Sequence, residues 1–208
     1  MLHFSAIAKK CNILNVRHMK KYAVWGIIVI ILFGAIISIS YSRFHHIDSQ
    51  TISSPITSSM IITSPLFEDG ALIPAKFSCD GGDFNPELLI QNVPEEAKTL
   101  ALIVDDTDAT RGGTFTHWLV WNIDPKTSVI KEESTPPKSV EGTNDFGHIG
   151  YGGPCPPKGS KPHHYHFRLF ALNVILNLES GANKSVLESE IQKHVIAETE
   201  LIGLYGRK

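Results

Sequence analysis

Segments rich in β-branched and aromatic residues alternate along this chain with long loops of Asp, Gly and Pro. Residues 99–106 (TLALIVDD), 115–124 (FTHWLVWNID) and 166–176 (HFRLFALNVIL) have the composition typical of β-strands. The loops between them, such as 134–147, are dense in turn-forming residues. A chain patterned in this way is expected to build its core mainly from antiparallel strands.

Only one segment has a clearly helical pattern. Ser185 and Glu188 have the spacing of a capping box, and Leu187, Ile191 and Val195 recur at every fourth position behind them. We therefore expect a mostly β fold, an antiparallel β-sandwich with one or two short helices.

The N-terminal part has a different composition. The first 47 residues carry six basic residues and no acidic one, and residues 22–42 form a charge-free, apolar run of 21 residues. About 20 such residues are enough for a helix to cross a bilayer. The basic residues before the run predict that the C-terminal part lies outside the cytoplasm.

These features divide the chain into four expected parts. They are a basic segment (1–21), a transmembrane helix or signal peptide (22–42), a Ser-rich linker (43–63) and a domain (64–208). The sequence leaves open whether translation starts at Met1 or at Met19. It also leaves open whether the domain stays membrane-anchored or is exported after signal cleavage.

The charge of the remaining part argues against nucleic acid as a partner. Residues 48–208 hold 13 basic residues against 21 acidic ones, and no basic cluster is interleaved with aromatic residues. The hydrophobic content of 42% and the charged content of 19% are typical of a globular protein.

Four histidines lie in or beside the Gly- and Pro-rich stretch 146–169. If 163–169 is extended, His163 and Tyr165 point to one side of the strand, and His164 and His166 point to the other. The four rings therefore cannot share one site. No spacing typical of a structural zinc site is present, and Cys155 has no neighbouring base that favours a nucleophile.

A second polar group lies at the ends of the first two strands. Asp106 and Asp108 close one strand, and His117 lies near the start of the next. A carboxylate close to an imidazole fixes the orientation and tautomer of the ring, and such a pair suits a small ligand pocket. A salt-bridged surface loop is the alternative interpretation.

Four ordered motifs resemble the phosphatidylethanolamine-binding protein family, in its bacterial and archaeal Raf-kinase-inhibitor-like branch. They are DDTDAT…FTHWLVWNI, FGHIGYGGPCPPKG, HHYHFRLFAL and HVIAETELIGLYGR. The resemblance implies a β-sandwich with a small pocket for anions or phosphorylated head groups. The ligand-binding residues that it implies are Asp106, Asp108, His117, His163 and Tyr165, with Gly152, Gly153 and Pro156 in the pocket wall.

Three classes of function are considered: a binding module, an inhibitor and an enzyme. A non-catalytic module for a small anionic or phosphorylated ligand is favoured, and an inhibitor of proteases or kinases acting through its surface is the alternative. No catalytic residue, metal or cofactor is expected, because Asp106 and His117 alone are too little for an active site. His164 stands where the family commonly has Arg.

The two cysteines of the expected domain allow two states. Cys79 and Cys155 both lie in loops, and an oxidising compartment permits a disulfide between them. Two buried free thiols are the equally open alternative.

Overall fold

The computed structural model describes residues 59–109 and 113–208 of the chain. The expected transmembrane or signal helix at 22–42 lies outside these residues. Within the two described ranges, no helix has the length and apolar character needed to cross a membrane.

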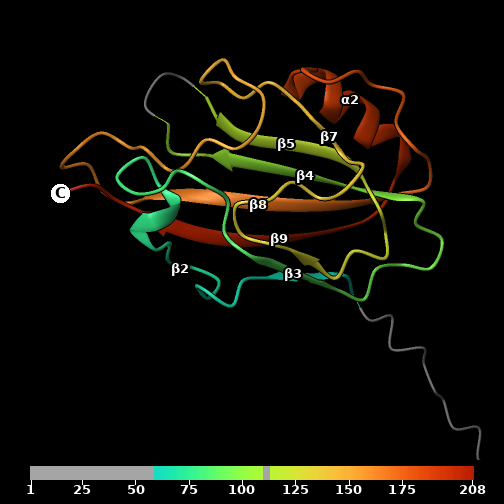
Figure 1. The fold of residues 1–208 in the computed structure, drawn as a ribbon, viewed down its shortest axis with the longest axis horizontal. Coiled ribbons are helices and arrows are strands. Elements are labelled where there is room, and N and C mark those ends of the chain that lie inside the picture. Colours follow the sequence, from blue (N-terminus) through green and yellow to red (C-terminus); the bar gives the residue numbers. More distant parts are fainter. Residues whose placement is uncertain (1–58, 110–112) are drawn as a thin grey trace, which may run out of the picture. The chain divides into compact units, whose positions relative to one another are not determined.

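The larger of two sheets has six strands, in the order β2-β9-β8-β4-β5-β7 (Figure 1). Neighbouring strands run antiparallel, except that β2 runs parallel to β9. The strands are β2 (Ala71–Leu72), β4 (Thr99–Asp106), β5 (Phe115–Ile123), β7 (Val140–Glu141), β8 (His163–Leu172) and β9 (Val195–Tyr205).

The smaller sheet consists of β1 (Ile61–Thr63), β3 (Leu88–Gln91) and β6 (Val129–Ile130), with β3 in the centre. β1 occupies the last three residues of the segment expected to be a linker, 43–63. It pairs with β3, and the side chain of Ile62 is buried opposite Ile90. Met60 and Ile62, both within the segment expected to be a linker, are buried in the hydrophobic core.

The two sheets share one hydrophobic core. Leu102 and Val104 of β4 pack there with Ile62 and Ile90 of the smaller sheet. The intervening residue Ile103 points to the opposite face of the larger sheet, where it packs beneath the helix α2 (Lys184–His194). β4 is therefore buried on both faces, which explains its continuous rather than alternating apolar sequence. The expected mostly β fold with one helix is confirmed.

The start of α2 differs from the expected capping box. Its N-cap is Asn183, whose side chain accepts a hydrogen bond from the Val186 amide. Ser185 already lies in the first turn, and Glu188 pairs with Arg168 instead of closing a box. The expected helical position Val195 is the first residue of β9. A short 3-10 helix, η1 (Ala75–Phe77), precedes the loop that contains Cys79.

Candidate functional site

A pocket lies at one end of three neighbouring strands of the larger sheet, β8, β4 and β5. β4 ends at Asp106, which pairs with Phe115 at the start of β5 and with Tyr165 near the start of β8. Antiparallel pairing thus brings three segments distant in sequence to the same place. The pocket has a volume of about 420 Å³. Its lining residues are Asp106, Ala109, Phe115, His117, Asp145, Phe146, Cys155, Pro156, Pro157 and His163.

His163 and Asp106 form a buried pair in this pocket. The His163 Nδ1 atom lies 2.7 Å from Oδ2 of Asp106, and the two side chains are only 6% and 7% exposed. The other carboxylate oxygen accepts a hydrogen bond from the Asp108 amide at 2.8 Å. Because the carboxylate accepts, Nδ1 of His163 donates its hydrogen, and Nε2 is the ring atom left for a ligand.

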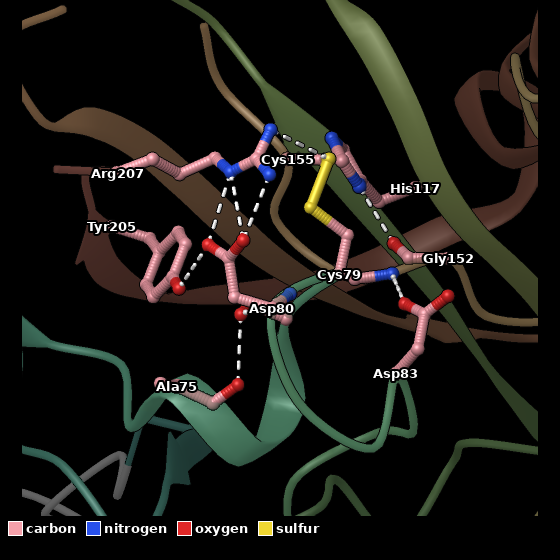
Figure 2. Close-up of a disulfide and its surroundings, with 11 residues drawn as sticks. Ala75, Cys79, Asp80, Asp83, His117, Gly152, Cys155, Tyr205 and Arg207 are labelled. Atoms are coloured by element: carbon pink, nitrogen blue, oxygen red, sulfur yellow. Dashed lines mark hydrogen bonds and ion pairs between the residues drawn. A yellow bond between two sulfur atoms is a disulfide. The ribbon is translucent and has the colours of Figure 1, made fainter. Parts of the chain in front are cut away.

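His117 is held by a backbone carbonyl instead of a carboxylate. Its Nδ1 donates to the Gly152 oxygen at 2.6 Å (Figure 2). The Gly152 amide donates back to the His117 carbonyl at 2.9 Å. Burial lowers the pKa of His117. The hydrogen bond to Gly152 raises it, but this effect is smaller. The ring is therefore neutral near pH 7 and presents the Nε2 lone pair.

The glycine amides of the 152–153 loop have partners within the protein. The Gly152 amide binds His117 as described, and the Gly153 amide donates to Oδ1 of Asp83 at 2.6 Å. These two amides therefore hold the loop in place and are not free to bind a ligand. A Cβ atom at Gly153 would lie 2.4 Å from the Phe77 carbonyl, so only glycine permits this close packing.

Two other expected ligand-binding residues lie beside the pocket and not on its surface. Asp108 pairs with the exposed ring of His164 at 2.6 Å and supports Asp106 only through its backbone amide. Tyr165 is fully buried, and its ring packs edge-on against His117 at 5.1 Å between centroids. The Tyr165 hydroxyl has no hydrogen-bond partner among the described residues, and burial raises its pKa.

Six of the ten lining residues were not among the ligand-binding residues predicted from the sequence, and three of these six lie together. Phe115, Asp145 and Phe146 form one side of the pocket, and the two phenyl rings meet edge-to-face at 4.7 Å. Phe115 shares a strand face with His117, which was the one available signal. The position of Asp145 and Phe146 depends on contacts of their loop with β5, which the sequence does not reveal.

A disulfide fastens the pocket wall to the loop after η1. Cys79 and Cys155 are bonded across 76 residues of sequence, and Cys155 lines the pocket (Figure 2). Beside them, Asp80 receives hydrogen bonds from the Arg207 guanidinium and from the Tyr205 hydroxyl. The bonds from Arg207 are the main cause of the lowered pKa of Asp80. The end of β9 is thereby held against the same loop.

The structure thus combines a two-sheet fold with two buried imidazoles that line a pocket at one end of its strands. The chain belongs to the phosphatidylethanolamine-binding protein family, whose profile, described as "Phosphatidylethanolamine-binding protein", matches residues 63–206. This match covers nearly the whole described part of the chain.

Relatives with known sequences or structures agree with this assignment. A "UPF0098 protein" of Pyrococcus horikoshii is 48% identical over 151 residues, covering 70% of this chain and 76% of the relative. A Mycobacterium tuberculosis protein named "Putative lipoprotein LppC" is 39% identical over 155 residues, covering 74% and 76%. The crystal structure of a phosphatidylethanolamine-binding protein homologue, CT736 of Chlamydia trachomatis, is similar with a TM-score of 0.68 at 40% identity, covering 72% of this chain and 99% of that one.

Proposed function

We propose that the chain is a non-catalytic binding module for a small phosphorylated ligand or anion, held in the pocket by His117 and His163. The observation that carries this proposal is the orientation of the two imidazoles. Each ring donates its Nδ1 hydrogen to a fixed acceptor in the protein, the Gly152 carbonyl or the Asp106 carboxylate. Each Nε2 is therefore available to a ligand in the same pocket.

The protonation state of the rings determines what they bind. A neutral ring offers a lone pair at Nε2, whereas an imidazolium offers an N–H, which forms charge-assisted hydrogen bonds with phosphate oxygens. Affinity for phosphate is therefore expected to rise as pH falls and the rings gain protons.

Substitution by Asn separates ligand binding from folding. The Asn amide can replace Nδ1 of His117 or His163 as a donor but has no atom at the position of Nε2. Calorimetry at pH 6 should show that His117→Asn and His163→Asn weaken binding of phosphorylethanolamine about tenfold or more, because each removes the ring atom Nε2 that contacts the ligand. His164→Asn is the matched control on the other face of β8 and should bind as tightly as the native chain. Equal losses in all three variants would contradict the proposal.

The absence of catalysis in the proposal rests on the lack of an activated nucleophile. Cys155, the thiol candidate in the pocket, is bonded to Cys79 and cannot form a thiolate. Phosphorus NMR of phosphorylethanolamine incubated with the protein should show an unchanged ligand. Formation of inorganic phosphate would identify an enzyme instead.

We also propose that the domain lies outside the cytoplasm, either anchored by residues 22–42 or released after cleavage. The charge-free run and its basic flank support this location, as does the disulfide, which persists in oxidising compartments. The name of the M. tuberculosis relative refers to a lipoprotein. Lipid attachment is not proposed here, because no cysteine directly follows the apolar run. A C-terminal reporter enzyme that is active only outside the cytoplasm should be active when fused to the chain.

A further inference from the structure

Asp105, the residue before Asp106, is a buried carboxylate on the opposite face of β4. Its side chain is 1% exposed, and its Oδ2 accepts from Arg168 of β8 at 2.6 Å and lies 3.0 Å from Nζ of Lys184, the first residue of α2. Glu188 of α2 accepts from the same Arg168 nitrogen at 2.9 Å. Successive side chains of a strand point to opposite faces, so Asp105 faces α2 while Asp106 faces the pocket.

The strand pairing beside Asp105 is irregular, and the irregularity contains His117. Val104 pairs with Trp118 and Asp105 pairs with Thr116, so the register between β4 and β5 skips His117. His117 lines the pocket, and the next residue, Trp118, lies in the core between the sheets, although consecutive residues of a regular strand would point to opposite faces. An extra residue in one strand forms a bulge that re-aims a side chain. The bulge thus directs His117 into the pocket.

Asp105 therefore connects α2 to both imidazoles of the pocket. The next residue, Asp106, binds His163, and the bulge that carries His117 lies opposite Asp105. We propose that Asp105 is a positioning residue: its two cationic partners fix the end of β4, and this strand end fixes the direction of both rings. A change at the start of α2 is then felt by a ligand in the pocket. This inference rests on the proposed phosphate site.

The cluster around Asp105 acts on the ligand through geometry and not by contact. The lining of the pocket includes none of its four side chains, which are those of Asp105, Arg168, Lys184 and Glu188. The cluster also combines two carboxylates with two cations, so it offers a ligand no excess of either charge.

Asp105→Asn separates positioning from simple electrostatics, because the two predict opposite signs. Removing a negative charge near the pocket should by itself tighten binding of an anion. The Asn amide binds two cations less strongly, and its NH2 group would take the buried place of Oδ1, which has no partner among the described residues. Calorimetry on the full-length chain at pH 6 should therefore show binding of inorganic phosphate weakened about fivefold. Native or tighter binding in this variant would overturn the inference.

Lys184 gives a second test with matched controls. Lys184→Met leaves Asp105 with one cation and should weaken phosphate binding about threefold, whereas Lys184→Arg keeps the charge and should bind as the native chain does. Lys193→Met removes the same charge from the same helix, in an ion pair with Glu190 at the surface, and should leave the affinity unchanged. Equal losses in Lys184→Met and Lys193→Met would show a general effect of charge and overturn the role of Asp105.

The ring of His117 reports its position without any ligand. Its Nδ1 hydrogen is held by the Gly152 carbonyl, so nitrogen NMR of the imidazole should show this hydrogen exchanging with water faster in Asp105→Asn and Lys184→Met than in the native chain. In Lys193→Met the exchange should be native. Native exchange in all three variants would overturn the positioning role. No binding of phosphate by the native chain would instead overturn the proposed function, and the ring signals would still test the position of His117.

Discussion

Two histidine–aspartate pairs of this molecule differ in burial and hardly at all in distance. His163 and His164 are consecutive residues of β8, and their partners, Asp106 and Asp108, are two residues apart. The nitrogen–oxygen distances are 2.7 Å and 2.6 Å, but the side chains are 6% and 7% exposed in the first pair and 50% and 44% in the second. A short contact thus says little by itself about what a pair contributes.

The direction in which each side chain leaves the strand causes this difference. Along β8, His163, Tyr165 and Phe167 are buried, whereas His164 is exposed. The inner pair has lost most of its water, so removing either side chain leaves the other buried without its hydrogen-bond partner. Water and ions screen the outer pair, and such surface pairs contribute at most about 1 kcal/mol.

The largest expected effect on stability concerns the disulfide between Cys79 and Cys155, which lies beside the pocket. Its sulfurs join residues that are 76 positions apart. Opening a loop of this length should lower the free energy of unfolding by about 4 kcal/mol. Guanidinium titration of a Cys79→Ser, Cys155→Ser double variant measures this loss, and Cys11→Ser is the control. An unfolding midpoint equal to that of the native chain would show that the disulfide does not stabilise the fold.

The two histidines themselves give the next effect. His163→Ala leaves the Asp106 carboxylate buried without its partner, which should cost about 3 kcal/mol of unfolding free energy. His164→Ala leaves Asp108 exposed to water and bonded to the backbone amide at position 164, so it should cost less than about 1 kcal/mol. Urea unfolding of both variants measures the two losses side by side. Losses of equal size would show that burial does not separate the two pairs.

The inward direction of His163 follows from local sequence, whereas the surroundings of the pocket do not. Strand alternation is a property of neighbouring residues, so the burial pattern of β8 matches the expectation. The apolar sequence of β4 and the helical pattern at Leu187 and Ile191 likewise predicted a strand and a helix. These features determine the mostly β fold and bring Asp106 and His163 together at the same end of two neighbouring strands.

The loop around the pocket depends on contacts between segments far apart in sequence. The Gly153 amide, in the predicted pocket wall, donates to Asp83, 70 residues away. Asp145 reaches the rim because Thr116, 29 residues earlier, bonds its carboxylate. No pattern of spacing within a loop of Gly and Pro predicts such partners.

His117 sharpens the comparison because it is buried without a carboxylate partner. Burial lowers its pKa in the folded protein below the usual value near 6.5. As pH falls below about 6.5, the unfolded chain takes up a proton that the folded chain does not, so stability falls with pH. The slope from this one group is at most about 1.4 kcal/mol per pH unit. Urea midpoints between pH 7 and pH 5 should show a shallower decline in His117→Asn than in the native chain.

The smallest expected effect comes from the exposed pair. Here the group with the shifted pKa is the Asp108 carboxyl and not an imidazole. The hydrogen bond from His164 holds the pKa of Asp108 below its usual value. A depressed carboxylate pKa stabilises the fold at pH values above that of the unfolded side chain, near 3.9, and this contribution is lost as pH falls through the folded pKa. Solvent screening limits it to a few tenths of a kcal/mol, in the range of surface pairs.

Asp108→Asn should therefore leave the urea midpoint at pH 7 almost unchanged and remove only a small part of the loss between pH 5 and pH 3. The Asp108 backbone amide, which supports Asp106, is retained in this variant. A loss of more than about 1 kcal/mol at pH 7 would mean that the exposed pair behaves like the buried one. In that case the side chain of Asp108, and not only its amide, would hold the loop that carries Asp106 into the pocket.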